Sequence, residues 1–176
     1  VLEELEFAYW WPSTVARYDA KGEVEITHSK ARVSQSTDQD WFSSPLARLM
    51  KTIERRLSAL VPGVPNRCEK WQATRYAKGG KFDFHFDCGH WGAEPAGERA
   101  RTVLIYLDTP KAGGGTRFRE LDLTVKPVAG RVVVWKNLTK EGECDPDMLH
   151  AGEPLRRGKK TVLVTWVRER RMRRGG

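Results

Sequence analysis

The sequence lacks three features that would each point to a particular class of protein. It has no run of about 20 apolar residues, the length that a helix needs to cross a bilayer, so no membrane-spanning segment is predicted. It has no internal repeat of solenoid length. Its three cysteines, Cys68, Cys88 and Cys144, cannot all pair within the chain, and their spacing indicates no disulfide framework. The cysteines therefore do not decide the compartment.

A start methionine is also missing. The chain opens at Val1 without a charged and then apolar leader, so we expect a processed or trimmed segment whose signal or anchor would not be visible. With 176 residues, 39% of them hydrophobic, and seven tryptophans, the chain can bury one sizeable core. We expect a single domain over residues 1–167, followed by a basic tail at 168–176.

This tail supplies half of the net charge of +8. Its charged residues are Arg168, Glu169, Arg170, Arg171, Arg173 and Arg174. An arginine cluster can bind an anionic partner, even nucleic acid. No aromatic residue interleaves the arginines as a stacking platform would require, so we favour a solvated tail and expect no nucleic-acid partner.

Local patterns predict helical support near the N-terminus and strands after it. Ser44-Pro45 is typical of an N-cap with a first-turn proline, and apolar residues at helical spacing predict a helix over about 44–61. Pro62-Gly63 would end it. Short β-rich segments, separated by glycine and proline clusters, are predicted at 71–75, 82–87, 102–107, 121–125, 131–135 and 161–167. This order is typical of an α+β, mainly β fold.

Two histidines and one carboxylate suggest a metal site. In an extended strand, residues i and i+2 project from the same face, so His85 and Asp87 can bind one ion together. His150 would complete the two-histidine, one-carboxylate set that is typical of iron(II) oxygenases. Three protein ligands leave room at iron(II) for a chelating cosubstrate and dioxygen. Taken alone, His85 or His150 would more often be a hydrogen-bonded packing residue.

A lysine ten residues after His150 strengthens this interpretation. If 148–151 and 160–167 are neighbouring antiparallel strands, Lys160 returns beside His150. A lysine suits a carboxylate, which indicates 2-oxoglutarate as cosubstrate, with its keto acid end on iron and its distal carboxylate on the lysine. Lys159 competes for that role. Strand alternation places Lys160, Val162, Val164 and Trp166 on one face, taken as the interior, and Lys159 on the other.

Several stretches of the chain together resemble a known family, the prolyl 4-hydroxylases of the iron(II) and 2-oxoglutarate dependent oxygenases, particularly the smaller plant and algal type. The matching stretches are 31–36 (ARVSQS), 53–56 (IERR), 75–80 (RYAKGG), 85–87 (HFD), 102–107 (TVLIYL), 113–118 (GGGTRF), 137–138 (NL) and 145–152 (DPDMLHAG), together with Lys160. The resemblance implies a double-stranded β-helix, or jelly roll, over about 70–167.

The resemblance also implies the functional residues. The iron ligands would be His85, Asp87 and His150, and Lys160 would contact 2-oxoglutarate. Tyr76 would be a hydroxyl partner of the cosubstrate, although the residues alone indicate a core tyrosine equally well. Arg99 and Trp166 fall where the family lines its substrate groove; simple filling of the interior is the alternative for Trp166.

Four positions depart from the family pattern. Glu153 stands in place of a cysteine, Thr161 in place of a tryptophan, Gly115 in place of an acidic residue, and Arg168 in place of a histidine near the substrate. None of these is an iron ligand. Because a guanidinium favours carboxylate partners, Arg168 would shift preference toward peptides with acidic neighbours.

The segment 88–98 follows the expected metal-binding strand, and its glycines and prolines suit either a mobile loop over the site or a passive surface connection. Cys88 and His90 beside His85 and Asp87 also raise a zinc alternative. A structural zinc site uses four closed ligands, and Cys144 with His150 makes a poor second pair, so iron is favoured.

The expected function is hydroxylation of peptidyl proline to 4-hydroxyproline, with 2-oxoglutarate and O₂ consumed and succinate and CO₂ formed. Asp87 favours hydroxylation over halogenation, because halogenating relatives carry a small non-ligating residue there. Ascorbate as a reductant, a proline-containing peptide or protein as partner, and the endoplasmic reticulum and secretory pathway as location are implied by the resemblance only. Alternatives are the same chemistry on a free amino acid or small metabolite, and a catalytically silent binding module.

Overall fold

The computed structural model describes residues 1–172, which fold mainly as β-strands. The helical segments are α1 (Leu2–Leu5), η1 (Gln39–Trp41), α2 (Ser44–Ser58) and η2 (Pro146–Met148). The strands of the first half are β1 (Trp11–Pro12), β2 (Val15–Tyr18), β3 (Val24–Thr27), β4 (Arg32–Val33), β5 (Gln35–Asp38), β6 (Gln72–Tyr76) and β7 (Lys81–His85). Those of the second half are β8 (Arg99–Tyr106), β9 (Ala112–Gly113), β10 (Thr116–Phe118), β11 (Leu123–Val125), β12 (Val132–Lys136), β13 (His150–Gly152), β14 (Leu155–Arg157) and β15 (Lys160–Arg168).

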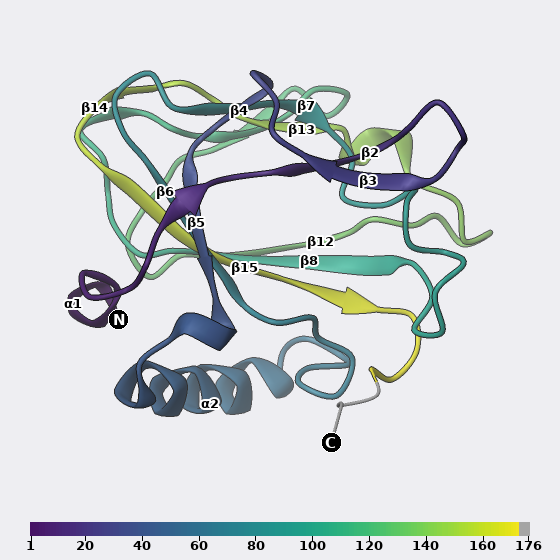
Figure 1. Ribbon diagram of the computed structural model, residues 1–176, viewed down its shortest axis with the longest axis horizontal. Helices are drawn as coiled ribbons and strands as arrows, with labels where there is room; N and C mark the ends of the chain where they lie inside the picture. The colour runs from purple at the N-terminus through teal and green to yellow at the C-terminus, as the bar shows by residue number, and fades with distance from the viewer. Residues whose placement is uncertain (173–176) are drawn as a thin grey trace.

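Two antiparallel sheets form the body of the fold. One sheet has the strand order β1-β5-β6-β15-β8-β12, and the other has the order β11-β10-β13-β7-β4. Figure 1 shows the sheet of β8 and β15 between α2 below and the layer of β4, β7 and β13 above. This is the expected mainly β jelly roll with helical support, and the prediction of its fold class is confirmed.

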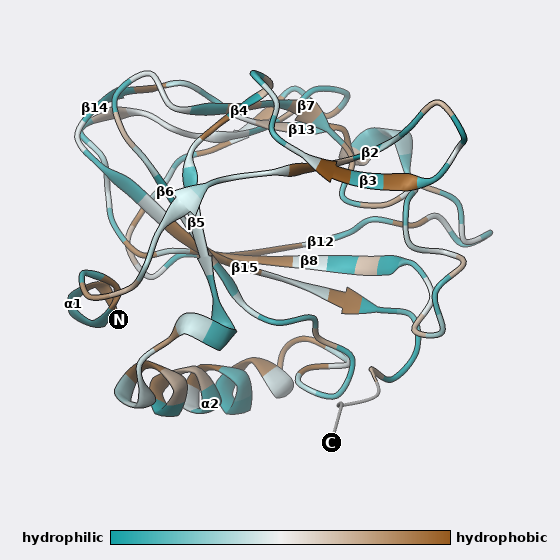
Figure 2. Ribbon diagram, viewed as in Figure 1, coloured by the Kyte–Doolittle hydropathy of each residue, from teal (hydrophilic) through white to brown (hydrophobic). Residues whose placement is uncertain are grey.

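Helix α2 forms because its start is capped and one of its faces is apolar. The N-cap is Ser43, one residue before the expected Ser44, and its hydroxyl accepts a hydrogen bond from the backbone N–H of Leu46 at 3.2 Å. Leu46 and Met50 are buried, whereas the opposite face is polar, and Figure 2 shows the two kinds of residue along its turns. The helix ends at Ser58, earlier than expected.

The six-stranded sheet presents different side chains on its two faces. Leu163, Val167 and Ile105 pack with Leu46 and Met50 in a core between the sheet and α2. The opposite face looks toward the five-stranded sheet, and its residues on β8 and β15 are Thr102, Leu104, Lys160, Val162, Val164 and Trp166. The interior face predicted for β15 by alternation is therefore correct.

The sequence prediction missed several short strands, β2 and β3 among them. Strands β2 and β3 form a hairpin that pairs Val15 with Thr27 and Tyr18 with Val24. None of their residues is buried. Val24–Thr27 alternates apolar and polar residues over four positions, but Val15–Tyr18 does not, so only one strand of the hairpin carries the pattern.

A disulfide joins Cys88 to Cys144, so the expectation of no disulfide framework was wrong. The pairing could not be read from spacing, because the fold brings the two together: Leu138 and Cys144 form an isolated β-bridge, which returns Cys144 toward the core. The Cα atoms lie 5.9 Å apart, within the usual range for a disulfide. Cys68 is free.

The basic tail begins later than expected. Arg168 is the last residue of β15 and is only 3% exposed, because its guanidinium pairs with Glu69 and Glu94. Arg173 and Arg174 lie outside the described residues. Within residues 1–172, no helix has the length and apolarity needed to span a bilayer.

Loss of the disulfide should destabilise the chain. The bond closes a sequence separation of 56 residues, for which the chain-entropy model gives roughly 4 kcal/mol of stabilisation. Chemical denaturation of Cys144→Ser without reductant should therefore show a fall in unfolding free energy of this order. Cys68→Ser is the matched control, with a smaller change expected. Equal stability of Cys144→Ser and the unsubstituted protein would contradict the assignment.

Candidate active site

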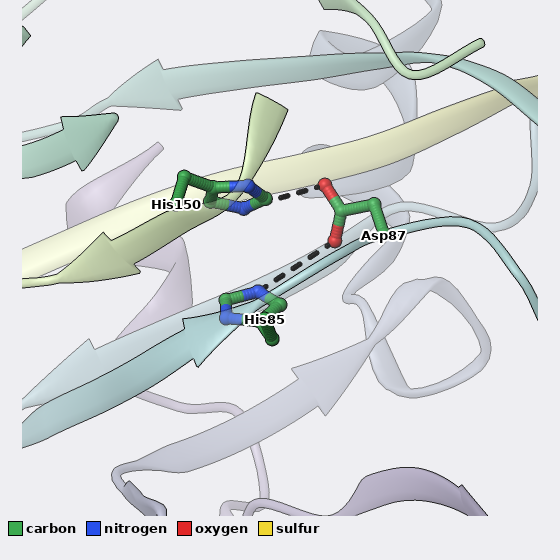
Figure 3. Close-up of side chains that lie close together, drawn as sticks. All are labelled: His85, Asp87 and His150. Atoms are coloured by element: carbon green, nitrogen blue, oxygen red, sulfur yellow. Dashed lines mark ion pairs between the residues drawn. The ribbon is translucent and has the colours of Figure 1, made fainter. Parts of the chain in front are cut away.

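Pairing of two strands brings the two histidines together. His85 is the last residue of β7, His150 is the first residue of β13, and the antiparallel register sets them directly opposite each other. Their ring centroids lie 4.3 Å apart. Asp87 lies two residues after His85, just beyond the end of β7 rather than inside a strand as predicted. Figure 3 shows both imidazoles facing its carboxylate.

Backbone carbonyl groups orient both imidazole rings. Nδ1 of His85 lies 2.8 Å from the carbonyl oxygen of Asp83, and Nδ1 of His150 lies 2.8 Å from that of Met148. A neutral ring that donates from Nδ1 keeps its lone pair on Nε2. The Nε2 atoms lie 3.7 Å (His85) and 3.6 Å (His150) from the Asp87 carboxylate oxygens. Both lone pairs therefore face the carboxylate.

The charge states suit metal binding. Burial, with His150 adding to the effect, lowers the pKa of His85 to about 3, so its ring is neutral and available as a ligand at neutral pH. Burial raises the pKa of Asp87, but His150, His85 and the Thr102 hydroxyl lower it by more, so that the pKa lies below its ordinary value. The Asp87 carboxylate is therefore ionised.

These three residues fit an iron(II) ion. One ligand atom from each of His85, Asp87 and His150 lies within 4.8 Å of the other two. Two imidazoles and one carboxylate on one side of an ion are the donor set typical of iron(II) oxygenases. The zinc alternative, in which Cys88 is a ligand, was wrong, because the Cys88 sulfur is bonded to Cys144.

The triad lines a pocket that lies between the two sheets. Lys160 and Tyr76 line the pocket from the six-stranded sheet, where they are paired across β15 and β6. Lys160 is 3% exposed, and its Nζ atom lies 4.7 Å from the centre of the Tyr76 ring. The pocket therefore holds the three candidate metal ligands together with the buried ammonium group of Lys160.

The route by which Lys160 reaches the pocket differs from the prediction. Strand β15 pairs with β6 and β8, whereas β13 belongs to the other sheet, so the two are not neighbouring strands. Lys160 instead faces the triad's sheet across the interior. Lys159 directly precedes β15 and is exposed, in agreement with the outward position that alternation predicted.

The positive charge of the buried Lys160 is only partly compensated by nearby carboxylates. Burial lowers the pKa of Lys160 from 10.5 to about 8, and Asp108 and Glu153, which raise the pKa, do not offset it. Such a shift corresponds to about 3 kcal/mol of free energy against the charged form. A buried cation of this kind is suited to an anionic ligand.

Arg99 and Trp166, expected in a substrate groove, lie against each other. The Arg99 guanidinium lies 3.7 Å from the centre of the Trp166 ring and 4.6 Å from that of Trp91. It also makes two hydrogen bonds to Glu69, at 2.7 and 2.8 Å. Trp166 lines the pocket. The sequence prediction missed the contact of Trp91 with the Arg99 guanidinium.

Arg168 does not have a free guanidinium for a substrate. It pairs with Glu69 at 3.0 Å and Glu94 at 2.8 Å, and its Nε donates to the carbonyl oxygen of Gly97 at 2.8 Å. The expected preference of Arg168 for acidic peptides therefore lacks support. The contacts of Arg168 with Glu94 and Gly97, together with the disulfide at Cys88, attach segment 88–98 to the rest of the fold at several points. A mobile lid, in contrast, would be attached only at its ends.

Several pocket residues were not predicted from the sequence. Thr102 lines the pocket, and Asn137 is hydrogen-bonded to Thr102. Both lie in stretches that carry the family resemblance, but no pattern assigned them a role. Arg32 and Trp135 line the pocket as well, and Trp135 packs edge-on to His150 with ring centroids 4.9 Å apart. For Thr102 the available signal was the period of two along β8, which places Thr102 and Leu104 on the same face of the strand.

A family model described as the 2OG-Fe(II) oxygenase superfamily matches residues 71–168, more than half of the chain. The chain belongs to this superfamily. Iron(II), 2-oxoglutarate and O₂ are the cofactor and cosubstrates of this superfamily, and the matched segment contains His85, Asp87, His150 and Lys160.

Curated relatives in this superfamily include prolyl 4-hydroxylase alpha subunits. The chain is 33% identical to subunit alpha-3 of Rattus norvegicus over 96% of its own length and 31% of the relative's. It is also 33% identical to subunit alpha-1 of Gallus gallus, over 83% of its own length and 29% of the relative's. The chain thus spans about a third of the length of the curated relatives it matches.

Solved oxygenase structures share the fold. The viral collagen prolyl hydroxylase of Paramecium bursaria Chlorella virus-1, in complex with 2OG, has a TM-score of 0.62 and 24% identity, and the match covers 78% of this chain and 79% of that one. A prolyl-4-hydroxylase from Pseudomonas putida has a TM-score of 0.57 and 18% identity, and covers 96% and 97%.

Because burial depresses the pKa of Lys160, its removal should stabilise this oxygenase. The destabilisation is fully present below the folded-state pKa of about 8 and fades as pH rises toward the ordinary value of 10.5. Lys160→Met keeps the apolar stem and should raise the melting temperature by several degrees near pH 7, about 2–4 °C per kcal/mol. Calorimetry near pH 7 and above pH 9 should show the gain shrinking. A lower melting temperature near pH 7 would contradict this account.

Proposed function

We propose that the chain is the catalytic domain of an iron(II)- and 2-oxoglutarate-dependent dioxygenase that hydroxylates peptidyl proline to 4-hydroxyproline. The observation that carries this proposal is the meeting of the His85, Asp87 and His150 ligand atoms in one pocket with the buried Lys160. Membership of the superfamily and the prolyl 4-hydroxylase relatives support the choice of reaction.

The proposed roles follow from the chemistry of each side chain. His85 and His150 would bind iron(II) through Nε2, and Asp87 would bind it through a carboxylate oxygen. Iron(II) and 2-oxoglutarate, when bound, supply oxidation of a C–H bond by O₂, with succinate and CO₂ as coproducts. The carbonyl groups of Asp83 and Met148 keep the rings oriented with the Nε2 lone pairs directed at one point. Ascorbate is proposed as reductant from the relatives.

Lys160 would bind the distal carboxylate of 2-oxoglutarate, and the hydroxyl of Tyr76 would be a second partner of the cosubstrate. The lysine is buried and its pKa is low, so a carboxylate beside it would restore the charge balance that burial disturbs. The Tyr76 ring, in contact with the ammonium, stabilises its charged form by a cation–π interaction.

Replacement of Lys160 should weaken cosubstrate binding selectively. Lys160→Ala leaves the carboxylate without a partner, a loss of roughly 2–5 kcal/mol, and the Michaelis constant for 2-oxoglutarate should rise accordingly. The exposed Lys159 provides the matched control, because Lys159→Ala changes the adjacent position without touching the pocket. An effect of Lys159→Ala with none from Lys160→Ala would show that the assignment is off by one residue.

A proline-rich peptide fits the aromatic surroundings of the pocket. Such peptides form stiff, extended polyproline II helices that dock on aromatic residues. Trp166 and Arg99, stacked on each other, together with Trp91 in segment 88–98, offer a surface of this kind. We therefore propose that these residues bind the peptide, and that Trp166→Ala raises the Michaelis constant for the peptide more than that for 2-oxoglutarate.

Mass spectrometry of reacted peptides tests the proposed substrate. A panel of proline-rich peptides and free proline is incubated with iron(II), 2-oxoglutarate, ascorbate and O₂, and succinate is measured in parallel. We expect a mass gain of one oxygen on peptidyl proline. Succinate formation stimulated by free proline or another small metabolite, with no modified peptide, would favour a small-molecule hydroxylase. No succinate under any condition would favour a silent binding module.

A further inference from the structure

Two buried polar side chains stand behind the Asp87 carboxylate. Thr102 belongs to β8, Asn137 directly follows β12, and each is 1% exposed. The Thr102 hydroxyl oxygen lies 2.6 Å from Asp87 Oδ2, and the Asn137 amide nitrogen lies 2.9 Å from the same hydroxyl oxygen. The carboxylate is therefore the end of a hydrogen-bonded row of three side chains.

The direction of these hydrogen bonds follows from the charges. The Thr102 hydroxyl has one hydrogen, and two acceptors compete for it: Asp87 Oδ2 at 2.6 Å and Asn137 Oδ1 at 3.3 Å. The ionised carboxylate is the closer and stronger acceptor. Thr102 therefore donates to Asp87, and its oxygen accepts from Asn137 Nδ2. The Asn137 amide thereby directs the hydroxyl hydrogen at Asp87.

The backbone of Asn137 is fixed on both sides. Its N–H donates to the carbonyl oxygen of Ala100 on β8 at 2.9 Å, and its own carbonyl oxygen accepts from the N–H of Asp145 at 2.9 Å. Asp145 lies five residues before His150. The backbone of Asn137 is therefore hydrogen-bonded both to the strand of Thr102 and to the segment that leads into β13. The row is anchored to the same framework as the metal ligands.

We propose that Thr102 and Asn137 are positioning residues for the metal, which hold the Asp87 carboxylate in one orientation by engaging Oδ2. The less engaged oxygen, Oδ1, lies 3.7 Å from Nε2 of His85 and is the one that we assign to the ion. This inference rests on the proposed iron site. It gives a reason for the burial of the polar side chains of Thr102 and Asn137 behind Asp87.

Manganese(II) binding to the full chain without cosubstrate tests this proposal independently of turnover. Free Mn(II) is followed by electron paramagnetic resonance during titration. Thr102→Val, which removes the hydroxyl and nearly keeps the shape, should weaken Mn(II) binding by about 10–100-fold. Thr102→Ser, which keeps the hydroxyl, should bind close to the unsubstituted level. A role in packing alone would give the opposite ranking, because serine loses the methyl group and valine does not.

Asn137 is tested by reversing its hydrogen-bonding character. Asn137→Asp places an acceptor where the amide donates and should turn the Thr102 hydroxyl away from Asp87, with a loss of Mn(II) affinity similar to that of Thr102→Val. In the double variant the losses should not add, because both act through one hydrogen bond. If Asn137→Asp does not fold, Asn137→Ala replaces it, and its loss should be smaller than that of Thr102→Val because the hydroxyl can still donate.

The outcomes separate this proposal from the proposed function. Thermal unfolding of each metal-free variant is measured first, to establish which variants are folded. If the unsubstituted protein binds Mn(II) no better than His150→Ala, the metal site itself is wrong. If it binds well and folded Thr102→Val binds equally well, or Thr102→Ser binds as weakly as Thr102→Val, the metal site stands and the positioning role is overturned.

Discussion

The active centre depends on the register between β7 and β13, which sets His85 opposite His150. A slip of one residue in an antiparallel pair would turn a side chain to the opposite face and remove it from the site. The register is held from both edges: β10 pairs Phe118 with His150, and β4 pairs Arg32 with Phe82. Asp87 follows from this placement, because it lies two residues beyond His85.

The two sheets contribute different parts of the site. The candidate metal ligands come from or directly follow the five-stranded sheet, whereas Lys160, Tyr76 and Thr102 come from the six-stranded sheet. The pocket therefore exists only when the sheets are stacked, and α2 supports this stacking from outside through the core around Leu46 and Met50. Within that frame, burial lowers the pKa of Lys160, because its charged form loses contact with water in the pocket.

Local patterns predicted what depends on neighbours in the chain. The face of Lys160, Val162, Val164 and Trp166 followed from the period of two, and the His85, Asp87, His150 and Lys160 set could be found because its chemistry is rare in combination. Partners distant in sequence could not be predicted. Strand β15 has neighbours other than β13, Cys88 pairs with Cys144, and Arg168 pairs with Glu69 and Glu94. Each depends on the order of strands in the sheets, about which alternation carries no information.

The central claim is that one iron(II) held by His85, Asp87 and His150 creates the binding site for 2-oxoglutarate. Anaerobic calorimetric titration of the full chain, first with iron(II) and then with 2-oxoglutarate, tests it most directly. The account predicts one iron(II) per chain, tight 2-oxoglutarate binding only after iron(II) is added, and loss of both in folded His150→Ala. Iron(II) binding by His150→Ala equal to that of the unsubstituted chain, or equally tight 2-oxoglutarate binding without metal, would contradict it.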